Sequence, residues 1–130
     1  MIKKTIKYTD YNGVEKERDF LFHLKKSDLI DLQYKDSRGF LSYIQSVIDS
    51  KDESALWKAF RDIVLMAYGE KSEDGERFIR SEELSKQFEQ TEAFSELIME
   101  LMTVEGAAAN FVNGLMPSDL VQKAKAEQNA

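Results

Sequence analysis

The segment from Glu70 to Glu82 concentrates side-chain oxygens around Asp74-Gly75, which is the kind of sequence from which a calcium-binding loop is built. If Gly75 takes the sixth position of such a loop, its last position falls on Ser81, where a bidentate glutamate is required. The nearest glutamate comes one residue late at Glu82, and Glu70 stands where the shorter aspartate is expected. The segment therefore predicts a charged, solvent-exposed loop in preference to a metal site.

A second candidate is an acidic stripe formed by Glu92, Glu96 and Glu100, which recur every four residues and so share one helix face. Like charges at this spacing destabilise a helix by only about 0.2–0.5 kcal/mol per pair, so a solvated face is the preferred interpretation. The alternative is an interface with a basic partner. Acid–base catalysis would need a concave, partly desolvated setting, which nothing in the sequence indicates.

The side chains most used in catalysis and metal binding are scarce. The chain has no cysteine and one histidine, which excludes thiolate and multi-histidine metal sites. His23 lies between Phe22 and Leu24, so strand alternation points it away from their face, as a surface histidine. Neither a nucleophile elbow nor a phosphate-binding loop is present. We predict no enzyme activity, no cofactor, and no catalytic, cofactor-binding or metal residues.

Charge and hydropathy narrow the possible partners. The net charge is −6, divided into +3 over residues 1–26 and −9 over the remainder. Duplex-binding proteins need a basic face to neutralise phosphates, so nucleic acid is not expected as a partner. No apolar run approaches the roughly 20 residues of a membrane helix, and the basic start lacks the apolar core of a secretory signal. These features predict a cytoplasmic protein without a membrane partner.

A β-hairpin is predicted at the start of the chain. Residues 2–8 alternate apolar and polar, and Asn12-Gly13 predicts a type I′ turn. The returning strand places Phe20, Phe22 and Leu24 on one face, while its charged stretch 15–19 should stand in water. A two-stranded hairpin is only marginally stable alone, so its aromatic face must lie on helices.

Apolar periodicity predicts five or six helices after the hairpin. Ser27, Ser81 and Thr91 are expected to be N-caps, and Gly69 a left-handed residue at the end of a helix over 53–68. Pro117 should end the helix before it, and Ser118 should cap a last short helix. The expected core positions are Leu56, Trp57, Phe60, Ile63, Val64, Ala67, Leu84, Phe88, Phe94, Leu97, Ile98, Leu101, Met102, Phe111, Val112 and Leu115, and in the second helix Phe40, Leu41, Ile44, Val47 and Ile48.

The predicted fold class is α+β, an N-terminal β-hairpin packed on a bundle of five to six α-helices. A length of 130 residues, with 42% hydrophobic and 32% charged residues, suits one globular domain. We expect this domain to span 1–117, with the hairpin at 1–25, the helices at 27–117, and a polar segment at 118–130. The broad apolar helix faces also make self-association a possible outcome.

Three stretches carry a resemblance to a known family. AYGEKSEDGERFIRSEELSKQFEQTEAFSELIMEL is the strongest, followed by GAAANFVNGLMP, and KTIKYTDYNGVEKERDFLFHLKKSDLIDL resembles the family's opening hairpin and first helix. In their residues, and in the order in which they follow one another, these stretches resemble the tail assembly chaperones of long-tailed phages and prophages of Gram-positive bacteria.

The resemblance implies a non-enzymatic assembly factor that binds and solubilises the tape measure protein and promotes assembly of the tail tube around it. It implies a host cell cytoplasmic protein that is absent from the mature virion. It also implies contact with the tail tube protein, mainly through a longer form made by ribosomal frameshifting, and a possible homo-oligomer.

Two other functions stay open at this point, a structural virion protein of the head–tail joint and a small regulatory protein-binding module. Contacts with the client would be expected to include Phe88, Phe94, Ile98 and Met102, although core packing explains the same residues equally well.

Overall fold

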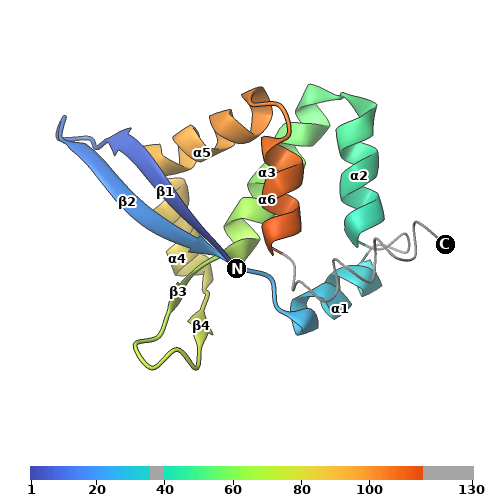
Figure 1. The fold of residues 1–130 in the computed structure, drawn as a ribbon, viewed down its shortest axis with the longest axis horizontal. Helices are drawn as coiled ribbons and strands as arrows, with labels where there is room; N and C mark the ends of the chain where they lie inside the picture. The colour runs from blue at the N-terminus through green and yellow to red at the C-terminus, as the bar shows by residue number, and fades with distance from the viewer. Residues whose placement is uncertain (36–39, 116–130) are drawn as a thin grey trace.

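The computed structural model describes residues 1–35 and 40–115, and it confirms an α+β fold with an N-terminal hairpin and six helices (Figure 1). The elements follow the chain in this order: β1 (Ile2–Thr9), β2 (Glu15–Phe22), α1 (Lys26–Lys35), α2 (Phe40–Ser50), α3 (Glu53–Ala67), β3 (Tyr68–Lys71), β4 (Phe78–Ile79), α4 (Glu82–Glu89), α5 (Glu92–Thr103) and α6 (Ala107–Leu115).

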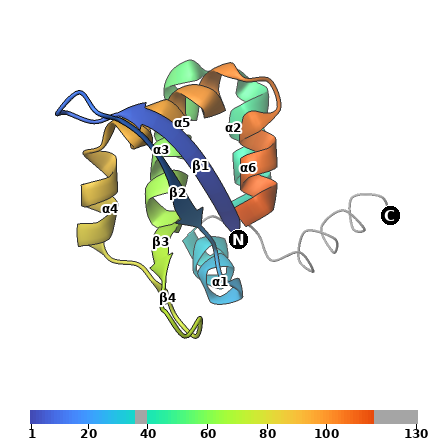
Figure 2. The same cartoon turned by 60° about the vertical axis from the view of Figure 1, so that its left-hand side comes forward.

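The hairpin of β1 and β2 is long, antiparallel and apolar on one face only. Its register runs from Ile2 opposite Phe22 to Thr9 opposite Glu15. Ile6, Phe20 and Phe22 are buried, while residues 15–19 are all exposed, as the charge pattern predicts. Figure 2 shows the hairpin passing in front of α3 and α5. Because Ile6, Phe20 and Phe22 are buried and residues 15–19 are exposed, the apolar face of the hairpin lies on the core and its charged stretch meets solvent.

The turn between β1 and β2 differs from the expected type I′ turn. Only Gly13 has a positive φ there (81°), whereas Asn12 does not. The Asp10 carboxylate accepts hydrogen bonds from the N–H groups of Asn12 (2.9 Å) and Val14 (3.0 Å). These bonds stabilise a type I turn followed by a left-handed glycine, which closes a three-residue loop.

Two short strands that the sequence did not predict extend the hairpin into a four-stranded sheet of order β1-β2-β3-β4. β3 follows α3 without a loop and pairs with β2, placing Gly69 opposite Leu21. The expected left-handed Gly69 is therefore wrong. A Cβ at this glycine would lie 2.7 Å from the Ile79 carbonyl oxygen and 2.7 Å from Arg80 Cγ, so close packing explains the residue.

The helix starts confirm two of the three predicted N-caps. The Ser81 hydroxyl accepts a hydrogen bond from the Leu84 N–H (3.1 Å), and the Thr91 hydroxyl accepts one from the Phe94 N–H (3.3 Å). Ser27 is not an N-cap, because α1 already begins at Lys26. Instead, the carboxylate of Asp28, in the first turn of α1, accepts a hydrogen bond from the Lys25 N–H just before the helix (2.7 Å).

One aromatic-rich core joins the sheet to the helices. Phe88 packs between the hairpin and α5, with ring centroids 4.4 Å from Tyr68, 5.2 Å from Phe20 and 5.7 Å from Phe94. Apart from Ala59, the buried apolar side chains of the described residues form a single cluster: Ile6, Phe20, Phe22, Leu24, Phe60, Ile63, Val64, Ala67, Phe88, Ala93, Phe94, Leu97, Ile98, Leu101, Phe111, Val112 and Leu115.

Two expected core residues lie at the surface instead. Trp57 is 42% exposed and Met102 is 37% exposed. Helical periodicity assigned Trp57 to the apolar face of α3 and Met102 to that of α5, but the packed neighbours leave these two side chains uncovered. Leu56 is half-buried against the core, and Leu84 is half-buried as well.

A half-buried ion pair connects α1 to the sheet. The Arg80 guanidinium, which follows β4, donates to both carboxylate oxygens of Asp28 at 2.7 and 2.8 Å. It also donates to the Met66 carbonyl oxygen at 3.2 Å, and the Lys25 N–H donates to Asp28 at 2.7 Å. The pair therefore holds the start of α1 against the end of α3.

Several predicted features lie outside the described residues. These are the break at Pro117, the cap at Ser118, the domain limit at 117 and the segment 118–130. The side chains of Phe40, Leu41, Ile44 and Ile48 in α2 also lie outside them, while Val47 is half-buried.

Candidate functional site

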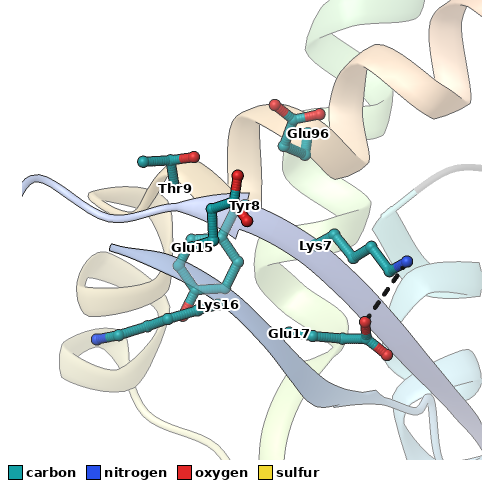
Figure 3. A pocket seen from close by; sticks show the side chains of 7 residues that line it. All are labelled: Lys7, Tyr8, Thr9, Glu15, Lys16, Glu17 and Glu96. Atoms are coloured by element: carbon teal, nitrogen blue, oxygen red, sulfur yellow. Dashed lines mark ion pairs between the residues drawn. The ribbon is translucent and has the colours of Figure 1, made fainter. Parts of the chain in front are cut away.

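Two adjoining hollows run along the hairpin where it passes over α5. The larger, about 510 Å³, lies among residues 7–9 of β1, residues 15–17 of β2 and Glu96 of α5 (Figure 3). The smaller, about 290 Å³, lies between residues 4–7 of β1 and the α5 side chains of Glu96, Leu97 and Glu100. The walls are mostly charged side chains, and both hollows share Lys7 and Glu96.

The acidic stripe of α5 meets basic residues of the same chain. Glu100 forms an ion pair with Lys4 of β1 at 2.7 Å, so the interpretation as a wholly solvated face is wrong at this position. Lys7 turns toward β2 instead and lies 3.7 Å from Glu17, as Figure 3 shows. Within residues 1–35 and 40–115, the exposed Glu96 has no ion-pair partner.

The tip of the hairpin is attached to the junction of α4 and α5. The Tyr11 hydroxyl donates to the Gln90 carbonyl oxygen at 3.2 Å. The neighbouring Glu92 carboxylate raises the pKa of Tyr11, because its negative charge favours the neutral, protonated phenol. The first glutamate of the stripe therefore interacts with the hairpin as well.

Exposed apolar side chains gather at the end of α5 and in the turn after it. Met99 is 59% exposed, Met102 37% and Val104 54%, all within six positions of the chain. We call these three residues the α5-end apolar group. Flexible methionine side chains adapt to irregular apolar partners, so this group suits contact with another protein. It contains no reactive or ionisable group.

Only residues 72–77 of the predicted loop at 70–82 form a turn between two strands, since the rest includes the end of β3, the whole of β4 and the start of α4. The Ser72 hydroxyl donates to the Asp74 carboxylate at 2.6 Å, and the Glu76 N–H donates to the same oxygen at 3.0 Å. These hydrogen bonds lower the pKa of Asp74. No cluster of three potential metal-ligating residues occurs in the described part of the chain.

His23 is half-buried, so its expected surface position is wrong. Its ring lies edge-on to Phe78 with centroids 5.9 Å apart. Burial lowers the pKa of His23, helped by the nearby N-terminal amino group and Arg80. Nδ1 is buried and makes no hydrogen bond within the residues described. A neutral imidazole that packs on an aromatic ring suits a structural role for His23 rather than a role in proton transfer.

The described surfaces therefore suit protein contact, and one comparison decides the family. The model of a family described as phage tail assembly chaperone matches residues 1–130. The chain belongs to the phage tail assembly chaperones. A search of curated proteins found no match, and a search of solved structures found none either. Among the described residues, no helix of this chaperone is both long and apolar enough to cross a membrane.

The expected client contacts fare unevenly in this chaperone. Phe88, Phe94 and Ile98 are buried in the core, which is the second explanation that the sequence allowed, and only Met102 reaches the surface. Met99, which is 59% exposed, was not among these four expected contacts. The Lys4–Glu100 pair was also missed, because the sequence shows the stripe but not the strand that crosses it.

Proposed function

We propose that this chaperone is a non-enzymatic factor that binds the tape measure protein, keeps it soluble and promotes assembly of the tail tube around it. Membership of the tail assembly chaperone family, matched over residues 1–130, is the observation that carries the proposal. It acts in the cytoplasm of the host cell and is absent from the mature virion. A longer form produced by frameshifting recruits the tail tube protein, and several copies act together on one client.

The surface chemistry supports a helical client. An amphipathic helix binds through an apolar stripe, which needs an apolar patch of adaptable shape on its partner. The α5-end apolar group offers such a patch, with Met99, Met102 and Val104 all more than a third exposed. The net charge of −6 favours solubility of the free chaperone, because charge repulsion opposes aggregation through its exposed methionines.

Co-expression with the tape measure protein of the same genome tests the proposal. Soluble yield and the mass of the complex, measured by size exclusion with light scattering, should show many copies of the chaperone on one tape measure chain. The double variant Met99→Glu/Met102→Glu should lower the soluble yield, because charged side chains would face the apolar stripe of the client.

Ile30→Glu is the matched control. Ile30 is 55% exposed on α1, so the variant makes the same kind of change at a distant apolar side chain and should retain full activity. Circular dichroism should show the same helix content in all variants. A tape measure protein that precipitates while the wild-type chaperone elutes alone would remove the main support. Purified virions that contain the chain would favour a head–tail joining protein, and a stoichiometric complex with a globular protein would favour a regulatory module.

A further inference from the structure

The outer edge of β1 is open. β1 is the first strand of the sheet order and pairs with β2 on one side only. Just beyond the end of β1, the Asp10 N–H donates to the Val14 carbonyl oxygen at 2.9 Å, so these two residues form a hydrogen-bonded pair. Hydrogen-bonded pairs occur at every second residue of an antiparallel ladder, so the even-numbered residues of β1 form the backbone hydrogen bonds to β2. The backbone groups of the odd-numbered residues point away from the sheet: Lys3, Thr5, Lys7 and Thr9. Within the described residues, no backbone hydrogen bond reaches them.

The space beside this edge has a floor. The two hollows described above follow β1 from Lys4 to Thr9, and α5 supplies Glu96, Leu97 and Glu100 beneath the edge. Lys4 neutralises Glu100, which leaves the exposed carboxylate of Glu96 at the centre of the groove without a cation from the described residues. A strand laid on the edge would direct alternate side chains onto this floor.

The charges on β1 select against a second copy of this chain. Two β1 strands paired antiparallel about Thr5 would set Lys3 of each opposite Lys7 of the other, and like charges directly opposite destabilise a strand pair. Lysine on an edge strand is a common protection against such self-pairing. A helix is excluded as well, because its backbone groups already bond within it and have none to offer the edge.

We infer that the open edge of β1 binds an extended segment of the client as a fifth strand, with a lysine or arginine of that segment on Glu96. Main-chain hydrogen bonds to the odd-numbered residues supply the attachment, and the cation on the α5 side supplies the selectivity. The inference rests on the proposed function in one respect, since it takes the tape measure protein as the source of the segment. It adds a second, non-helical contact to the apolar one proposed above.

Amide hydrogen exchange on the complex with the tape measure protein tests the inference. The amides of Thr5, Lys7 and Thr9 should exchange rapidly in the free chaperone and at least about tenfold more slowly in the complex, as paired strand amides do. Short overlapping peptides that tile the tape measure protein provide the second probe. Those that bind should carry lysine or arginine at alternate positions and should lose binding when their alternate backbone nitrogens are methylated.

Glu96→Lys should weaken the binding of those peptides by about tenfold, because it replaces an attraction with a repulsion in the groove. Glu105→Lys is the matched control, since this exposed glutamate in the turn after α5 undergoes the same charge change and should leave binding unaltered.

The outcomes separate the two proposals. A complex in which the β1 amides exchange as fast as in the free chain overturns the fifth strand and leaves the chaperone function standing. If no complex forms, the proposed function fails and the inference fails with it. Protection that is already present in the free chain assigns the edge to the chain itself, or to a second copy where it grows with concentration, and either result overturns the inference.

Discussion

The ion pair between Asp28 and Arg80 should stabilise the fold far more than the charged pairs on the hairpin. The Asp28 side chain is 18% exposed and the Arg80 side chain 19%, and both carboxylate oxygens accept hydrogen bonds from the guanidinium. Asp28→Asn keeps the shape of the side chain but removes its charge. Arg80 would then remain largely buried without a counter-charge.

The expected magnitude lies between two limits. Removing one partner of a fully buried pair costs about 3–5 kcal/mol. Exposed pairs contribute only about 0–1 kcal/mol. Because roughly a fifth of each side chain is still exposed, we expect Asp28→Asn to lower the free energy of unfolding by about 2–3 kcal/mol. For a chain of this length, that loss lowers the Tm by about 8–12 °C.

Urea and thermal unfolding followed by circular dichroism measure this loss. Glu17→Gln is the matched control, since Glu17 lies 3.7 Å from Lys7 with both side chains exposed, and it should change the free energy of unfolding by less than about 0.5 kcal/mol. Equal losses in the two variants would refute the reasoning, because they would show that burial of the Arg80 pair adds nothing.

The same ion pair predicts how the free energy of unfolding falls at acidic pH, a decrease that we call the acid limb. Burial raises the pKa of Asp28, but the hydrogen bonds from Arg80 and the Lys25 N–H outweigh it, so the folded pKa lies below the ordinary 3.8. The stabilisation is therefore complete above pH 3.8 and is lost as the pH falls through the lower folded value. Asp28→Asn should flatten this limb, and an unchanged limb would contradict the assignment.

Four further variants separate the effects of packing from those of exposure. Gly69→Ala should destabilise the fold by about 1–3 kcal/mol in thermal unfolding, since its Cβ would meet the Ile79 carbonyl at 2.7 Å, and a neutral result would show that β4 shifts freely. In urea unfolding, Phe88→Ala should lower the free energy of unfolding by about 3–5 kcal/mol, because Phe88 is buried. Trp57→Ala should lower it by less than about 1 kcal/mol, because Trp57 is exposed, and the reverse order would contradict the placement of the core. Burial lowers the pKa of His23, so as the pH falls the unfolded chain binds a proton at this residue before the folded chain does. The free energy of unfolding should therefore fall as the pH drops below 6.5. A His23→Gln variant that retains the whole of this pH dependence would contradict the burial of His23.

The elements that local sequence could predict are those with a clear period. Strand alternation located β1 and β2, and the hydroxyls of Ser81 and Thr91 located the starts of α4 and α5. β3 and β4 have four and two residues, too few for a period to show, and their turn residues read as an exposed loop. Gly69 was misread for a related reason, since the crowding that requires glycine comes from Ile79 and Arg80 across the turn.

The candidate surface was predictable only in part. The glutamate stripe of α5 is visible in the sequence, but its neutralisation by Lys4 depends on the angle at which the hairpin crosses the helix. Periodicity gave α3 and α5 broad apolar faces without showing where cover ends, so Trp57 and Met102 were assigned to the core. Which margin of a stripe stays exposed is set by neighbouring helices, and a single helix sequence does not contain that information.

α6 closes the structure against its beginning, and this fixes when the protein can finish folding during translation. The Leu24 N–H donates to the Leu115 carbonyl at 3.2 Å, Phe111 meets the Phe22 ring at 5.3 Å between centroids, and Gly114 lies against Ile2. Because the ribosome makes the hairpin well before α6, the aromatic face of the hairpin lacks the cover that α6 provides until Leu115 has left the ribosome. A nascent chain therefore carries an unfinished apolar surface for most of its synthesis, and mutations that weaken α6 should lower the yield of soluble protein more than their effect on equilibrium stability suggests.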